Sequence, residues 1–215
     1  AGFSIVSYTG TGSDANVGHG LSSAPELIIT KSRSTTGDWK VHTSAIDGSW
    51  DVGTLNSTSA FGNSSYTAST NSIFYVGSGA PTNASSVTYV SYLLHSVKGY
   101  SKFGSYTGNG SLDAPFIHLG FKPAWLMIKR TDTTNSWVMF DNKRNAFNVV
   151  DKHLFANTTD PEDSSANYNE VDFLSNGFKL REDNNTINAS GGTYIFMAFA
   201  ELPFVNSSGI PNNAR

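Results

Sequence analysis

The segment SYTGTGS at residues 7–13 recurs, with one substitution, as SYTGNGS at residues 105–111, an offset of 98 residues. The same offset aligns further residues of the two halves: Pro25 with Pro123, Lys31 with Lys129, and Trp39 with Trp137. A second set follows in the same order at an offset of 105, in which 83–85 (NAS) matches 188–190 and 88–90 (TYV) matches 193–195 (TYI). Two collinear sets of matches indicate an internal duplication.

The duplication divides the chain into two copies of roughly 100 residues, a common size for a small domain. We predict a first domain at residues 1–100 and a second at residues 101–215. The longer second offset places an insertion in the polar stretch 160–169, since a surface loop tolerates additional residues. No Pro-rich or Ser-rich linker separates the copies, so we expect them to pack closely.

Short runs of β-branched and aromatic residues, bounded by Gly, Asn and Ser, predict strands rather than helices. The predicted strands are 3–8, 26–31, 39–43, 72–76 and 87–97 in the first copy, and 102–106, 124–130, 136–140, 177–181 and 192–200 in the second. The last strand of each copy is apolar on both faces, which is typical of a strand in the middle of a covered sheet. One helical turn is expected within 145–156. The predicted fold class is all-β: two tandem, closely packed β-sandwich repeats, jelly-roll-like and related by internal duplication.

The composition excludes several classes of protein. Of the 215 residues, 38% are hydrophobic and 13% aromatic, and the net charge is −3, which is not the composition of a disordered chain. No apolar run approaches the roughly 20 residues of a membrane-spanning helix, so no membrane insertion is expected. The near balance of 14 basic and 17 acidic residues argues against nucleic acid as a partner. The absence of cysteine excludes disulfides, thiol nucleophiles and Cys-based zinc sites.

No motif points to catalysis, to a metal or to a cofactor. We interpret His19 and His118 as structural residues that the duplication produced. One cluster of acidic residues could supply oxygen ligands to Ca²⁺: Asp160, Glu162, Asp163, Glu170 and Asp172. The cluster lacks the Asp-x-Asp-x-Asp-Gly pattern of a calcium-binding loop, and a solvated surface loop also explains it. Glycoside hydrolysis needs two carboxylates across a cleft, and nothing singles out a pair among the conceivable ones, Asp141, Asp151, Glu170 and Asp172. We therefore expect no enzyme activity, no metal and no cofactor.

Carbohydrate binding has more support in the sequence than catalysis. Aromatic side chains pack against the C–H-rich faces of sugars, while Asn, Asp and Ser side chains hydrogen-bond the hydroxyls. Trp39 and Trp137 occupy equivalent positions and are expected in the core. Trp50 lies in a loop and is expected to be exposed, so we take Trp50, Asp51 and Tyr66 as the candidate carbohydrate-binding residues.

Five blocks of the sequence carry a family resemblance. The longest and most specific is GYSKFGSYTGNGSLDAPFIHLGFKPAWLMIKR at 99–130; the others are FSIVSYTGTG at 3–12, VGHGLSSAPELIITK at 17–31, VDFLSNGFKLR at 171–181 and NASGGTYIFMAFAELPF at 188–204. These blocks resemble a family of virion-associated proteins of tailed, mainly marine, bacteriophages. Members of that family are structural proteins, often tail-fibre or lectin-like modules, and no catalytic residues carry over from it. The resemblance implies a component on the exterior of a phage particle.

Three functions remain open. The first is a non-enzymatic tail-fibre or distal appendage module that recognises host-surface glycans. The second is a capsid decoration or appendage protein that binds only other virion chains, and the third is a glycan depolymerase. The resemblance also implies other virion proteins as partners and a homo-oligomer, with a trimer favoured, in which exposed strand edges are covered.

Overall fold

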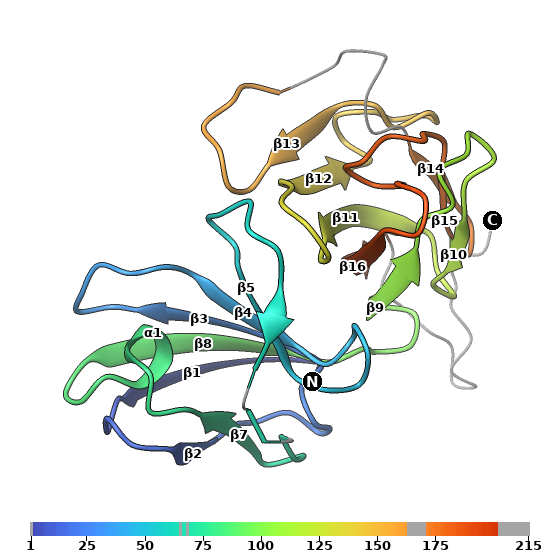
Figure 1. Ribbon diagram of the computed structural model, residues 1–215. Helices are drawn as coiled ribbons and strands as arrows, with labels where there is room; N and C mark the ends of the chain where they lie inside the picture. Colours follow the sequence, from blue (N-terminus) through green and yellow to red (C-terminus); the bar gives the residue numbers. More distant parts are fainter. Residues whose placement is uncertain (1, 65, 68, 163–170, 202–215) are drawn as a thin grey trace. The chain divides into compact units, whose positions relative to one another are not determined.

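The computed structural model describes residues 2–64, 66–67, 69–162 and 171–201 (Figure 1). The chain divides into two compact units, Ala1–Ser96 and Val97–Arg215, called unit 1 and unit 2 below. Both units are built almost entirely from antiparallel strands, so the predicted all-β class is confirmed. The predicted domains, 1–100 and 101–215, stay a prediction, and most of the predicted insertion at 160–169 lies outside the described residues.

Unit 1 consists of a large sheet, a small sheet and a short helix. The large sheet has the strand order β1-β8-β3-β4-β5-β6, with bounds β1 Phe3–Thr9, β3 Leu27–Ser32, β4 Lys40–Thr43, β5 Asp51–Thr54, β6 Gly62–Asn63 and β8 Thr88–Leu94. The small sheet pairs β2 (Ala15–Gly18) with β7 (Ile73–Val76), and α1 (Ala80–Asn83) precedes β8. Leu93 of β8, Ile28 of β3 and Phe74 of β7 belong to one buried cluster. The core of unit 1 therefore lies between its two sheets.

Unit 2 repeats this plan with a larger apolar core. Its large sheet has the order β13-β12-β11-β16-β9, with bounds β9 Ser101–Thr107, β11 Pro123–Arg130, β12 Trp137–Asp141, β13 His153–Phe155 and β16 Thr193–Ala200. Its small sheet has the order β10-β15-β14, with bounds β10 Phe116–His118, β14 Val171–Leu174 and β15 Gly177–Leu180. Phe140, Phe178 and Phe196 pack in the cluster between these sheets.

In both units the last strand lies between the first and the third, as β1-β8-β3 in unit 1 and β9-β16-β11 in unit 2. Strand β8, which covers 88–94 of the predicted run 87–97, is therefore paired on both edges, as predicted. Strand β16 is also buried on both faces over 194–198, as predicted, whereas buried and half-buried residues alternate along β8, so the second face of β8 is only half covered.

A buried asparagine in each unit ties the turn after the first strand to the loop before the last. In unit 1, Asn83 Oδ1 accepts a hydrogen bond from Thr11 N at 2.9 Å, and Asn83 Nδ2 donates to Ser13 O at 2.6 Å. In unit 2, Asn188 Oδ1 accepts from the backbone N of Asn109 at 2.9 Å, and Asn188 Nδ2 donates to Ser111 O at 2.9 Å.

Stacked tyrosines join the same pair of strands in each unit. The rings of Tyr8 and Tyr89 lie 5.3 Å apart in unit 1, and those of Tyr106 and Tyr194 lie 5.0 Å apart in unit 2. Each last-strand tyrosine also accepts a backbone hydrogen bond, Tyr89 from Ala84 N and Tyr194 from Ala189 N. The first and last strands are thus joined by side chains as well as by their backbone ladder.

The structure differs from the sequence prediction in short segments. No helical turn is found in 145–156, where β13 forms instead, so that prediction was wrong. The strands β2, β5, β6, β10, β13 and β14 were not predicted. These strands have two to four residues each, and a period-2 pattern is weak over so few residues, although the four-residue strands β4, β7 and β15 were predicted.

The close approach of two loops explains why glycine occupies positions 10 and 108. A Cβ atom at Gly10 would lie 2.1 Å from the carbonyl oxygen of Ala84, and one at Gly108 would lie 2.3 Å from that of Ala189. Both distances are far below van der Waals contact, and both obstacles are backbone atoms. Any larger residue would therefore separate the first strand from the loop before the last one.

We predict that Gly10→Ala and Gly108→Ala each lower the free energy of unfolding by about 1–3 kcal/mol, the usual cost of overpacking. Gly62→Ala is the matched control, because no atom lies within 4 Å of a Cβ at that position. Chemical denaturation of the full chain measures the difference. Equal stability of the Gly10→Ala, Gly108→Ala and control variants would contradict the proposed close approach.

Candidate functional site

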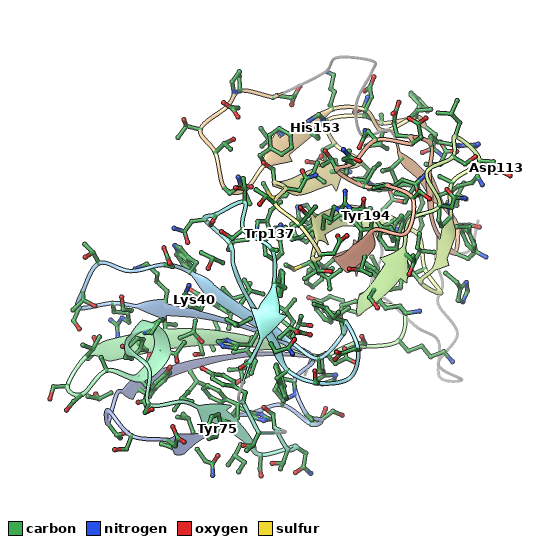
Figure 2. All side chains as sticks on the ribbon, in the orientation of Figure 1. Lys40, Tyr75, Asp113, Trp137, His153 and Tyr194 are labelled. Atoms are coloured by element: carbon green, nitrogen blue, oxygen red, sulfur yellow. The ribbon has the colours of Figure 1, made fainter. Side chains whose placement is uncertain are left out.

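Unit 1 contains a pocket of about 570 Å³ beside the inner face of its large sheet. Strands β4, β5 and β6 contribute Lys40, His42, Val52 and Asn63, and the neighbouring segments contribute Asp14, Ser64, Tyr66, Gly77, Ser78, Gly79, Pro81 and Thr82. In Figure 2, Lys40 is labelled on the large sheet, and Tyr75 is labelled on β7 of the small sheet. The lining combines aromatic, hydroxyl, amide and charged groups, which is typical of a site for a polar ligand.

A row of polar side chains crosses the inner face of the large sheet and reaches this pocket at Lys40. Ser91 pairs with Thr30 across β8 and β3, Thr30 pairs with Lys40 of β4, and Lys40 pairs with Thr54 of β5. The side chains of this row bond one another: the hydroxyls of Thr30 and Ser91 lie 2.7 Å apart, and Lys40 Nζ donates to Thr54 Oγ1 at 2.8 Å.

The corresponding row of unit 2 is entirely apolar. Phe196 pairs with Ile128, Ile128 with Val138, and Val138 with Phe155, on strands in the same order. All four residues belong to the core of unit 2 or pack against it. Unit 1 thus has polar groups where unit 2, with the same strand order, has hydrophobic core.

His42 lies in the next row and is the most deeply buried polar side chain lining the pocket, with 3% exposed. Its ring stacks on Tyr66, with 4.0 Å between centroids and 9° between planes. In the described part of the chain, its Nδ1 is buried and has no hydrogen-bond partner. Burial, with a smaller contribution from the charge of Lys40, lowers the pKa of His42 to about 3. The imidazole is therefore neutral at physiological pH.

Tyr66 is held in place by contacts on its ring and its hydroxyl. The hydroxyl lies 2.8 Å from Thr82 Oγ1, and the edge of its ring packs against Tyr75 at 5.1 Å. Burial raises the pKa of Tyr66, so its hydroxyl stays protonated. Tyr8 donates to the backbone oxygen of Thr82 at 2.6 Å, which fixes the same segment from the side of β1.

Among the described residues, two charged groups line the pocket, Lys40 and Asp14. Lys40 Nζ also contacts Asp38 Oδ2 at 3.2 Å, so its ammonium is held between β5 and the loop before β4. Asp14 accepts a hydrogen bond from Ser78 N at 2.7 Å. The pKa of Asp14 is lowered by hydrogen bonds from Tyr75 and Ser78, and the pKa of Tyr75 is raised to about 12 by the same contact with Asp14.

The three predicted carbohydrate-binding residues do not form one site in the structure: Tyr66 lines the pocket, and Trp50 and Asp51 do not. The role of Tyr66 in binding stays a prediction. Trp50 is 7% exposed and packs in the core of unit 1, so the exposure predicted for it was wrong. Asp51 is also buried, with no hydrogen-bond partner found for its Oδ2 in the described residues, and burial raises its pKa.

Sequence reasoning missed Lys40 and His42, although a signal for them was present. The offset of 98 aligns Lys40 with Val138 and His42 with Phe140. Alternation places residues two apart on the same face of a strand. A comparison of the inward positions of the two predicted copies would therefore have found polar residues in the first copy where the second has apolar ones.

Other kinds of site are less well supported by the described residues. None of their His, Asp and Glu side chains form a group of three or more that could hold a metal ion. Asp14 is the only carboxylate among the described residues lining the pocket, whereas glycoside hydrolysis uses two. In the same part of the chain, no helix is long and apolar enough to cross a membrane.

The chain belongs to the DUF7483 family, described as a domain of unknown function, whose family model matches residues 1–203. No curated protein matches the chain, and no solved structure matches it. The match covers the described residues of both units up to residue 201 and therefore includes the pocket. It says nothing about phage virions, so the resemblance to a phage family stays a prediction.

The pKa of His42 predicts how stability depends on pH. An unfolded histidine takes up a proton near pH 6.5, whereas folded His42 does so only near pH 3. Neutral His42 therefore does not lower the free energy of unfolding above pH 6.5. Below that value the free energy of unfolding falls by about 1.4 kcal/mol for each pH unit, until pH 3. We expect His42→Phe, which introduces the residue found at the equivalent position 140, to remove this loss.

Chemical denaturation at pH 7 and pH 5 measures the effect, which amounts to about 2 kcal/mol between the two. The exposed His118 provides the control variant, His118→Phe, which is expected to keep the full pH dependence. The interpretation fails if the His42→Phe variant loses as much stability on acidification as the unmodified chain.

Proposed function

We propose that this chain is a non-enzymatic structural protein on the exterior of a phage virion, in a tail fibre or other distal appendage, and that the pocket of unit 1 binds host-surface glycans. The resemblance to phage virion proteins supports the location, and the chemistry of the pocket supports the ligand. The observation that carries the proposal is the contrast between the polar row of unit 1 and the apolar row of unit 2.

We further propose that the two units are copies produced by an internal duplication and that the first became specialised for binding. Both units place an asparagine, a pair of stacked tyrosines and a close glycine contact at corresponding positions. When one of two duplicated copies carries polar groups at core positions, those groups lower its stability, because they lose contact with water and replace hydrophobic packing. Lys40 is the member of the row that lines the pocket in the described residues, and a ligand that needs its ammonium is a direct reason for a protein to keep it.

The lining suits a neutral, polyhydroxylated ligand. The Lys40 ammonium can donate to sugar hydroxyls and the Asp14 carboxylate can accept from them, while Asn63 and Ser78 can do either. A second pocket of about 250 Å³ shares Lys40 and Pro81 with the first. The shared residues make the two pockets neighbours, which fits an oligosaccharide better than a single sugar.

One observation also supports association with other chains. In β1, an edge strand of the large sheet, Phe3 is 44% and Ile5 58% exposed. Apolar side chains on an unpaired edge favour pairing with another chain. We therefore keep other virion proteins as partners, and a homo-oligomer with a trimer favoured, as part of the proposal. A capsid decoration protein that binds only virion chains is the alternative.

Glycan arrays probed with the full chain test the binding. We expect Lys40→Met and Asn63→Ala each to weaken binding about tenfold, because each removes a hydrogen-bonding group worth roughly 1–2 kcal/mol. The control is Asn16→Ala, which changes an exposed asparagine of β2 that does not line the pocket. Binding that is unchanged in both variants, or equally reduced in the control, would exclude the pocket as the glycan site.

A further inference from the structure

We infer that unit 2 carries a second saccharide-binding site, in the pocket formed by the loop between β12 and β13. The pocket has a volume of about 220 Å³. The loop contributes Asn142, Asn145, Ala146, Phe147, Asn148 and Val150 to its lining, and Lys122 and Phe173 complete it. All of these residues belong to unit 2. The site is therefore separate from the pocket of unit 1, and the inference does not rest on the function proposed for that pocket.

An exposed aromatic ring stands beside this pocket. Phe147 is 85% exposed, more than any other large hydrophobic residue in the described chain, and its neighbour Val149 is 39% exposed. Both residues lie in the same loop, and Phe147 is the one that lines the pocket. A phenyl ring that is open to solvent beside amide groups can pack against the C–H face of a pyranose.

Hydrogen bonds fix the loop on both sides of Phe147, within the loop itself at Asn145 and to β14 at Asn148. Asn145 Nδ2 donates to Asp151 Oδ1 at 2.8 Å, and Asn145 Oδ1 accepts from Lys152 N at 2.9 Å. Asn148 Nδ2 donates to Phe173 O at 3.1 Å, and Asn148 Oδ1 accepts from Phe173 N at 2.9 Å. A ligand would therefore meet a loop that is already ordered, which reduces the entropic cost of binding.

The amide groups keep hydrogen-bonding capacity for a ligand. Each primary amide has two N–H donors and an oxygen with two lone pairs, and the bonds of Asn145 and Asn148 use only part of this capacity. Asn142 Nδ2 donates to Glu201 Oε1 at 2.9 Å, which fixes its orientation. The Oδ1 of Asn142 is buried without a hydrogen-bond partner in the described residues, so the capacity open to a ligand lies on Asn145 and Asn148.

The charges at this pocket favour a neutral ligand. Lys122 is the only charged residue lining it among the described residues, and its Nζ lies 3.0 Å from Glu201 Oε2. Because this ion pair neutralises the lysine, the pocket offers amides and a phenyl ring rather than net charge. The chemical class that fits is a neutral hexopyranose, with its C–H face on Phe147 and its hydroxyls toward the asparagines.

The test is a titration of the ¹⁵N-labelled full chain, followed by NMR, with the methyl glycosides of glucose, galactose, mannose and N-acetylglucosamine. We expect at least one glycoside to shift the side-chain amide signals of Asn142, Asn145 and Asn148 in a saturable way. Phe147→Ala is expected to weaken this binding about tenfold, which corresponds to roughly 1.4 kcal/mol. The matched control is Leu112→Ala, which removes another exposed apolar side chain of unit 2, 64% exposed and outside the pocket.

The inference is overturned if no glycoside moves these three amide signals, or if the Phe147→Ala and Leu112→Ala variants bind equally well. The same spectra report on unit 1 separately. Shifts confined to residues around Lys40 would leave the proposed function intact and reject the second site. Shifts around Phe147 that persist in the Lys40→Met variant would support the second site whether or not unit 1 binds.

Discussion

The buried amide of one asparagine in each unit, Asn83 or Asn188, joins the two segments on which the sheet depends. The last strand can pair with the first only if the loop before it lies against the turn that follows the first strand. The amide does this by accepting from one backbone N–H of the turn and donating to a nearby carbonyl. Both asparagines are almost fully buried, so an unpaired amide there would cost about 1–3 kcal/mol per group.

Once the strand order is fixed in this way, the inner face of the sheet can vary. In unit 2 that face carries phenylalanine, isoleucine and valine, and it forms the hydrophobic core. In unit 1 the equivalent positions hold serine, threonine and lysine, and a pocket lies beside them. The burial of Tyr89 and Leu93 on the same strand as Ser91 maintains the fold around the polar row. The buried residues around the polar row of unit 1 thus keep the fold stable, although polar groups at core positions lower stability.

The long strands, and the short strands β4, β7 and β15, were predicted because their apolar residues recur with a clear period and because the two proposed copies support each other. The sequence did not predict the short strands β5 and β13, whose three or four residues carry no readable pattern. Trp50 was misjudged for a similar reason: it directly precedes β5, and a residue at the start of a sheet strand can point into the core although its neighbours are Gly, Ser and Asp.

The two pockets depend on contacts that a single sequence does not reveal. The stacking of His42 on Tyr66 joins residues 24 positions apart, with the short strands β5 and β6 between them in the sequence. The exposure of Phe147 likewise depends on where Asn145 and Asn148 fix their loop. Aromatic and amide residues were recognised as suitable for sugars, but their placement around a cavity required the structure.

The most direct test of the central claim is a crystal structure of the full chain soaked with the glycan that it binds most tightly on an array. If the polar row of unit 1 exists for a ligand, the glycan will occupy the pocket beside it, with hydroxyls within hydrogen-bonding distance of Lys40 and Asn63. A glycan bound elsewhere on the chain, with this pocket left to water, would contradict the claim.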